Sequence, residues 1–255
     1  MRTVKIIGVI PSRFSAQRFP GKPLALIHGI PMINRVVQQC KKSKLLSEVW
    51  VATDDGRIQQ AVKGMADRVV MTPKNLLSGT DRVAWAVQST AAQLIINIQG
   101  DEPVIHPSVV DAAAKLLIDD SKLQMSTVVV PMQNSKDLSN PNVVKAAIAF
   151  TGSVLYFSRS PIPYFRDKSE GFNSLGYKHL GIYGYRKPWL LKMTKLKSTP
   201  LEQIEKLEQL RTLEHGVQIK ASIQPWDSIS VDQPSDIKKV EQFLKHQFKT
   251  NGRIN

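Results

Sequence analysis

The stretch VKIIGVIPSRFSAQRFPGKPL, residues 4–24, decides the fold of this 255-residue chain. It opens on a nearly unbroken apolar, β-branched run from Val4 to Ile10, the pattern of a strand buried on both faces of a parallel sheet. A loop rich in Ser, Pro and Gly follows, and its charged residues are all cations: Arg13, Arg18 and Lys22. Ligands of open α/β sheets lie beyond the carboxyl ends of the strands, so this loop is placed to bind an anion. Three cations without an acid favour a polyphosphate, and the alternative is a solvated basic loop.

Strand and helix patterns alternate through the N-terminal half of the chain, with short links between them. This rhythm predicts an α/β fold with a mainly parallel central sheet and helices on both faces. Polar clusters follow the strands, so we expect them to converge at one edge of the sheet. Strands are expected at 48–53, 69–71, 94–98 and 124–130, and helices at about 31–42, 55–66, 81–92 and 107–119.

The regular alternation of strand and helix patterns ends at about residue 131. Two strand patterns follow each other without a clear helix between them, and a long polar loop precedes the strand expected at 178–186. We interpret 131–186 as an insertion or dimerisation subdomain within a single domain that spans 1–255. The other expected elements are strands at 143–150, 154–158, 218–223 and 228–231, and helices at 188–196, 201–215 and 234–248.

The composition is that of a soluble globular protein, with 42% hydrophobic and 22% charged residues. No apolar run is long enough to cross a bilayer, and no secretory leader pattern occurs at the N-terminus, so we expect a cytoplasmic protein without a membrane partner. Cys40 is the single cysteine and lies in a helical pattern, which favours a buried, inert thiol.

The net charge of +14 could indicate a nucleic acid, a membrane surface or a polyanionic substrate as the partner. The basic residues are spread along the chain and fall mostly on solvated helix faces. No aromatic-rich RNA-binding signature or zinc-finger spacing accompanies them. We therefore expect no nucleic-acid partner.

Two carboxylates follow predicted strands near opposite ends of the chain. Asp101 stands just after the strand at 94–98, and Asp232 directly follows 228–231. Mg²⁺ typically takes one or two protein carboxylates and completes its coordination with phosphate oxygens and water. Beside a cationic loop, such a pair suits transfer at a phosphorus atom. The alternative is that each aspartate caps the helix that follows it.

Eight motifs in this order carry a resemblance over about residues 4–245: PSRFSAQRFPGKPL, VATDD, SGTDR, NIQGDEP, LYFSRSPIP, KHLGIYGYR, LEQLR and VDQP. Together they resemble the 3-deoxy-manno-octulosonate (Kdo) cytidylyltransferase family. KHLGIYGYR and LEQLR separate this branch from the related CMP-sialate synthetases. The resemblance implies a Rossmann-like nucleotidyltransferase fold, a homodimer, and an Mg²⁺-dependent reaction. CTP and an acidic eight-carbon sugar would give the CMP-sugar for lipopolysaccharide biosynthesis and release pyrophosphate.

The resemblance also implies roles for individual residues. Those implied in catalysis are Arg13, Lys22, Asp101 and Asp232, with the two aspartates as magnesium ligands. Those implied to contact CTP are Arg13, Arg18, Lys22, Ser78, Gly79, Thr80 and Arg82. Those implied to contact the acceptor sugar are Gln99, Arg159, His179, Tyr183, Glu208 and Gln209. Without the resemblance, the arginine among them would indicate a surface ion pair, and the histidine and tyrosine a packed strand face.

The chain departs from the family pattern at a few positions. Ser12 and Phe14 stand where Ala and Tyr are common, Asp81 replaces Glu, and VDQPSD replaces VDTPED. We expect these changes to leave the implied chemistry intact, but they leave open whether the acceptor is Kdo or its 8-amino analogue. The remaining alternatives are a nucleotidyltransferase for another acceptor, such as a sialate, and a non-catalytic basic binding protein.

Overall fold

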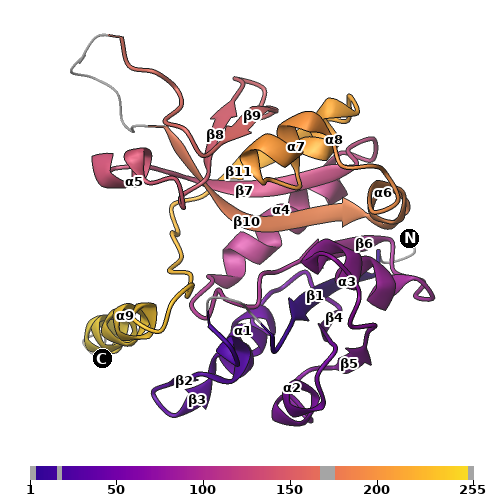
Figure 1. Cartoon of the computed structure of the whole chain (residues 1–255), viewed down its shortest axis with the longest axis vertical. Helices are drawn as coiled ribbons and strands as arrows, with labels where there is room; N and C mark the ends of the chain where they lie inside the picture. Colours follow the sequence, from indigo (N-terminus) through magenta and orange to yellow (C-terminus); the bar gives the residue numbers. More distant parts are fainter. Residues whose placement is uncertain (1–3, 16–18, 167–175, 252–255) are drawn as a thin grey trace.

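The computed structural model describes residues 4–15, 19–166 and 176–251, with side chains up to residue 246. Arg18 lies outside the described residues, so its expected contact with CTP has no structural counterpart here. A mixed sheet forms the centre of the molecule (Figure 1). Its main strands lie in the order β11 (Ile219–Ile223), β7 (Met125–Pro131), β10 (Tyr177–Arg186), β6 (Leu94–Asn97), β1 (Ile6–Ser12), β4 (Glu48–Thr53) and β5 (Arg68–Met71).

Strand β1 is the centre of the parallel half of the sheet. It pairs in parallel with β4 and β6, and β4 pairs in parallel with β5. On the other side β7 and β11 are also parallel, but β10 runs antiparallel to both β6 and β7. The expected mainly parallel sheet is confirmed, with β10 as the exception that joins its two halves.

Side chains of β1 alternate between two apolar cores. Ile6 and Ile10 enter a core with α1 (Met32–Cys40), α2 (Gly56–Ala61) and α4 (Pro107–Asp119). Ile7 and Val9 enter a core with α3 (Gly79–Val87), α6 (Lys187–Met193) and α8 (Leu210–Glu214). All four β1 side chains are at most 3% exposed, so this strand is buried on both faces, as its composition predicts.

The segment interpreted as an insertion contributes to the central sheet itself. It contains β10, which lies between β6 and β7. Of its described elements, α5 (Ser135–Ser139) and the hairpin of β8 (Lys145–Ile148) and β9 (Val154–Ser158) lie off the main strand order, with β8 paired to β10. A subdomain boundary at residue 186 therefore does not match the sheet, because β10 is hydrogen-bonded on both sides.

The C-terminal helix α9 (Asp236–Asn251) lies apart from the sheet, beside the small hairpin of β2 (Leu26–Ile27) and β3 (Ile30–Pro31), as Figure 1 shows. A third core holds it there, with Ile27, Met32, Val104, Val231 and Val240 buried together. An extended segment, 224–235, connects β11 to this helix. None of the described helices is long and apolar enough to cross a membrane.

Two expected elements are wrong. Residues 228–231 form no strand, because Ile229 and Val231 pack into the α9 core instead of pairing with the sheet. The helix expected at 201–215 is two short helices, α7 (Pro200–Glu205) and α8, because Lys206 takes a left-handed conformation with φ of 54° between them.

Candidate active site

Three segments that are far apart in sequence meet at the carboxyl ends of β1 and β6. The Lys22 ammonium lies 2.7 Å from Asp101 Oδ2 and 3.6 Å from Asp232 Oδ1. Val231 donates its backbone N–H to the Asp101 carbonyl at 3.0 Å, which holds the C-terminal segment against the turn after β6. The expected convergence of the cationic loop and the two aspartates is confirmed.

Two glycines allow this approach. Gly21 lies directly before the short helix η1 (Lys22–Leu24) and has a φ of 73°, a backbone conformation that residues with a Cβ rarely adopt. A Cβ at Gly100 would lie 3.0 Å from the Pro11 carbonyl oxygen. The backbones after β1 and β6 are thus closer than other residues would permit, and Lys22 reaches Asp101.

Neither aspartate caps a helix. His106 is the N-cap of α4, and its ring nitrogen lies 3.3 Å from the Ser108 N–H. Helix α9 begins at Asp236, whose carboxylate accepts the backbone N–H of Asp232 four residues before it. The side chains of Asp101 and Asp232 are 27% and 51% exposed, so both carboxylates have oxygens accessible to a ligand. The capping alternative is therefore wrong for both residues.

A cavity of about 160 Å³ opens beside this cluster. Arg13, Lys22, Gln99 and Asp101 all line it. The Arg13 guanidinium donates to the carbonyls of Leu76 and Ser78, at 3.2 Å from the latter, and the Gln99 amide donates to the Gly181 carbonyl at 3.2 Å. The cavity is thus lined by two cations and one carboxylate, a composition that suits a phosphorylated ligand.

The carboxylate pair suits a divalent cation in one specific way. Asp101 and Asp232 face the same ammonium and keep exposed oxygens, and Mg²⁺ needs only one or two protein carboxylates when phosphate oxygens complete its coordination. Within the described part of the chain there is no group of three or more His, Cys, Asp or Glu side chains that could hold a metal by protein ligands alone. The donor set therefore fits a cation that binds together with a phosphate ligand.

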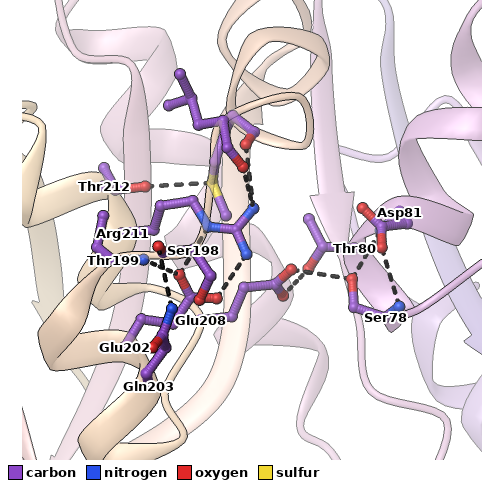
Figure 2. Close-up of polar contacts among 12 residues, drawn as sticks. Ser78, Thr80, Asp81, Ser198, Thr199, Glu202, Gln203, Glu208, Arg211 and Thr212 are labelled. Atoms are coloured by element: carbon purple, nitrogen blue, oxygen red, sulfur yellow. Dashed lines mark hydrogen bonds and ion pairs between the residues drawn. The ribbon is translucent and has the colours of Figure 1, made fainter.

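A second polar cluster lies at the start of α3, as Figure 2 shows. The Glu208 carboxylate accepts hydrogen bonds from Ser78 Oγ at 2.9 Å and from Thr80 Oγ1 at 2.6 Å. Gly79 is the first residue of α3, between these two hydroxyls. Burial raises the pKa of Glu208, and the two hydroxyl donors oppose that shift. Residues implied for CTP and for the sugar therefore share one cluster.

A larger cavity of about 660 Å³ adjoins this cluster and is lined by Ser78, Asp81, Glu208 and Arg211, among others. Arg211 forms a two-point ion pair with Glu202 at 2.8 and 2.5 Å, and it also donates to the main-chain carbonyls of Met193 and Leu196 (Figure 2). These bonds tie α6, α7 and α8 together. Arg211 therefore fixes the wall that carries Glu208.

Two of the residues implied for the sugar, His179 and Tyr183, lie on β10 and line neither of the two cavities described above. His179 is 7% exposed, and its Nε2 lies 2.8 Å from Thr127 Oγ1. Burial lowers the pKa of His179 to about 3, so the imidazole is neutral near pH 7. The Tyr183 ring lies 5.1 Å from the His179 ring. Gln209 is 4% exposed, and its Nε2 has no hydrogen-bond partner among the described residues.

Sequence comparisons decide the family of the chain. The cytidylyltransferase family profile matches residues 7–219. A Geobacter sulfurreducens protein named 3-deoxy-manno-octulosonate cytidylyltransferase is 45% identical over 250 residues, which cover 95% of this chain and 100% of that protein. This chain belongs to the Kdo cytidylyltransferase family. A Myxococcus xanthus protein of the same name is 43% identical over 96% of this chain and 98% of its own length.

Solved structures agree with this assignment. A CMP:2-keto-3-deoxy-manno-octonic acid synthetase complexed with CTP shares 36% identity and a TM-score of 0.89 over 95% of this chain and 99% of its own. A 4-diphosphocytidyl-2C-methyl-D-erythritol synthase from Anaerococcus prevotii has a TM-score of 0.63 at 11% identity over 95% of this chain and 99% of its own, and it shows the fold alone. The expected nucleotidyltransferase fold is confirmed.

Two residues implied by the Kdo cytidylyltransferase pattern have surroundings that do not fit the expected contacts. Arg82 is fully buried and donates to Thr72 and, at 2.8 Å, to Asp54, so it faces the end of β4 and not a cavity. Arg159 donates to three main-chain carbonyls, Glu205 at 2.8 Å, Pro141 at 2.9 Å and Lys206 at 3.4 Å. Direct contact of Arg82 with CTP is excluded in this conformation. The hydrogen bonds of Arg159 join the end of β9 to the end of α7.

Three residues of the site were missed. Ser12 and Asn97 are buried, and Ser12 Oγ and Asn97 Oδ1 have no hydrogen-bond partner among the described residues. Ser12 lines the smaller cavity, and the Asn97 amide donates to Thr80 Oγ1 at 3.4 Å. Both are polar residues at the end of an apolar strand, which was the available signal. Glu102 is the third of these residues. Its position directly after Asp101 was the only sequence signal that could have indicated a role in the site.

Proposed function

We propose that the chain transfers CMP from CTP to the anomeric hydroxyl of Kdo, or of its 8-amino analogue, and releases pyrophosphate. The product would be the activated sugar for lipopolysaccharide biosynthesis. The observation that carries this proposal is the meeting of Lys22, Asp101 and Asp232 at 2.7 and 3.6 Å beside a cationic cavity. Membership of the Kdo cytidylyltransferase family supports the same acceptor class.

Arg13 and Lys22 would bind the triphosphate, because both line the smaller cavity. Their positive charges would stabilise the charge that develops on the departing pyrophosphate. Asp101 and Asp232 would hold Mg²⁺, which when bound would neutralise phosphate charge and favour attack at the α-phosphorus. Asp101 also orients the Lys22 ammonium, which keeps the cation at the cavity wall before CTP binds.

The acceptor sugar carries many hydroxyls, and the second cluster supplies matching hydrogen-bond groups. Glu208 can accept from a sugar hydroxyl, while Gln99 and Gln209 offer amides. His179 is neutral near pH 7, because burial lowers its pKa, so it would bind a hydroxyl and not the sugar carboxylate by charge. Ser78, Gly79 and Thr80 would recognise the cytosine ring through hydroxyl and backbone groups.

The decisive experiment is pyrophosphate release with CTP and a panel of acceptors: Kdo, 8-amino-Kdo and N-acetylneuraminate. We expect release with one of the first two, little release with the sialate, and little when UTP replaces CTP. Absence of release with both Kdo and 8-amino-Kdo would reject the acceptor class. Salt-dependent binding of random duplex DNA without turnover would instead support the non-catalytic basic protein.

We also propose that the chain forms a homodimer through the β8–β9 region. Three large apolar side chains are exposed there or on the adjoining end of β11: Phe150, Leu155 at 64% and Ile223 at 48%. Gly152 accepts a backbone hydrogen bond from Ala221, so the two segments are neighbours. Light scattering should give a dimer mass for the native chain and a monomer mass for Leu155→Glu; a native monomer would reject the proposal.

A further inference from the structure

The segment 224–235 carries Asp232 across the molecule from the end of β11 to α9. We propose that Glu102 is a positioning residue: through its hydrogen bond with Ser228 it holds this segment so that Asp232 lies beside Asp101 and Lys22. The inference rests on the proposed function, in which Asp101 and Asp232 share a cation. It adds a residue that contacts neither substrate nor cation.

The contact between the two residues is buried. Ser228 Oγ donates a hydrogen bond to Glu102 Oε2, and the residues are 6% and 9% exposed. Glu102 directly follows Asp101 in the chain, so one turn contacts the segment at two points. The second point is the hydrogen bond from the Val231 N–H to the Asp101 carbonyl at 3.0 Å. The turn therefore sets the position of both carboxylates relative to each other.

Other contacts also hold the segment. Lys178 Nζ donates to the Ser228 carbonyl at 3.2 Å, the Asp232 N–H donates to the Asp236 carboxylate at 3.1 Å, and Val231 is buried in the α9 core. Lys178 Nζ lies 2.7 Å from Asp227 Oδ1, but the Asp227 side chain is 55% exposed, and exposed ion pairs contribute little. Trp226 stacks on His106 with ring centroids 4.1 Å apart, and it is 47% exposed. The far end of the segment is fixed by α9, where Glu241 accepts the His28 N–H at 2.9 Å.

The Ser228 bond thus closes the span between the sheet and α9 just before Asp232. Its loss would leave the buried carboxyl group of Glu102 without its hydrogen-bond partner and would loosen the residues that lead to Asp232. Displacement of a ligand by about 1 Å is enough to cost catalysis. The expected consequence is a weaker cation site with an otherwise intact fold.

The test compares Ser228→Ala, Glu102→Gln and Ser126→Ala. Gln at position 102 keeps a side-chain oxygen that can accept the hydrogen bond from Ser228 Oγ. Glu102→Gln should therefore keep the positioning of Asp232. Ser126→Ala is the matched control, because Ser126 Oγ donates to the Ala113 carbonyl at 2.7 Å in the core and is equally buried, away from the segment. Two readouts are used: amide hydrogen exchange of 224–235 in metal-free protein, and the Mn²⁺ concentration that gives half-maximal pyrophosphate release.

We expect Ser228→Ala to speed exchange at Val231 and Asp232 about fivefold and to raise the Mn²⁺ requirement by about the same factor. Turnover at saturating Mn²⁺ should stay within about twofold, while Glu102→Gln and Ser126→Ala leave both readouts near the native values. Equal exchange and Mn²⁺ requirement in Ser228→Ala and Ser126→Ala would overturn the positioning role. That result would leave the proposed function standing, whereas full turnover in Asp232→Asn would reject the shared cation site itself.

Discussion

Two cations that the resemblance assigns to CTP differ completely in their surroundings. Lys22 lies beside a cavity, and its two carboxylate neighbours are 27% and 51% exposed. Arg82 is 0% exposed, and its partner Asp54 is 10% exposed. Both residues form ion pairs across long stretches of sequence, so the presence of an ion pair does not separate their roles.

Their burial and their charged neighbours separate them. At Lys22 two carboxylates face one ammonium, so the cluster carries a surplus negative charge that a second cation would neutralise. At Arg82 one carboxylate and one hydroxyl contact one fully buried guanidinium, whose Nε has no hydrogen-bond partner among the described residues. Burial lowers the pKa of Arg82, and the positive charge of Arg13 lies close enough to lower it further. The first arrangement is open to a ligand, and the second is closed. Under the proposed function Lys22 would serve catalysis, and Arg82 would serve stability.

Asp101→Asn is the strongest test of the open cluster. It removes one negative charge that would hold the cation, and we expect turnover to fall about 1000-fold, or about 4 kcal/mol of transition-state stabilisation. The melting temperature should change little, because the side chain caps no helix and is partly exposed. Pyrophosphate release at saturating Mg²⁺ measures the loss, and Asp232→Asn should behave in the same way.

Arg82→Met tests whether the closed pair of Arg82 and Asp54 contributes to stability and not to turnover. It leaves Asp54 without its partner in a largely buried position, so we expect about 3 kcal/mol lower free energy of unfolding. Turnover per folded molecule should stay near the native value. The double variant Arg82→Met, Asp54→Asn should recover part of the stability, as urea unfolding would show. A native stability with weaker CTP binding would instead place Arg82 in the nucleotide site.

Lys22→Ala should have an intermediate effect. It removes the ammonium that would bind the triphosphate, so we expect kcat/KM for CTP to fall about 50-fold, or about 2.3 kcal/mol. Preference between Kdo and 8-amino-Kdo should not change. Steady-state kinetics with both acceptors gives the comparison, and an altered preference would move Lys22 to the sugar site.

The open cluster was predictable because it follows from topology. A parallel sheet brings the carboxyl ends of its strands to one edge, so the loop after β1, which carries Lys22, and the turn after β6, which carries Asp101, are expected to approach one another. Asp232 was placed correctly for the wrong reason: 228–231 is not a strand. The alternation of Ile229 and Val231 is the same in a strand and in an extended segment packed on a helix.

The closed pair was not predictable from the same reasoning. Arg82 follows a Ser-Gly-Thr turn that is well placed for a nucleotide, but helix α3 turns its side chain toward Asp54 at the end of β4. That contact depends on how α3 packs on the sheet, which local pattern does not specify. Arg159 shows the same limit, because its partners are main-chain carbonyls at the end of α7 and in the loop before β8.

His179 shares one property with Arg82 and one with Lys22: it is buried, and the resemblance assigns it to a binding site. Its pKa in the folded chain is lowered to about 3 by burial, against 6.5 as its ordinary value. The folded state therefore binds fewer protons than the unfolded state between these pH values, and stability falls as pH drops through that window. From pH 7 to pH 5 this residue should cost about 2 kcal/mol of unfolding free energy.

His179→Gln removes that titration while keeping an amide that can hydrogen-bond Thr127. The stability difference between the native chain and this variant, measured by urea unfolding, should shift in favour of the variant by about 2 kcal/mol between pH 7 and pH 5. An unchanged difference would mean that His179 becomes protonated in the folded chain. A protonated His179 could then bind the sugar carboxylate by charge. Burial of this side chain would then not be enough to decide whether it stabilises the fold or binds the sugar.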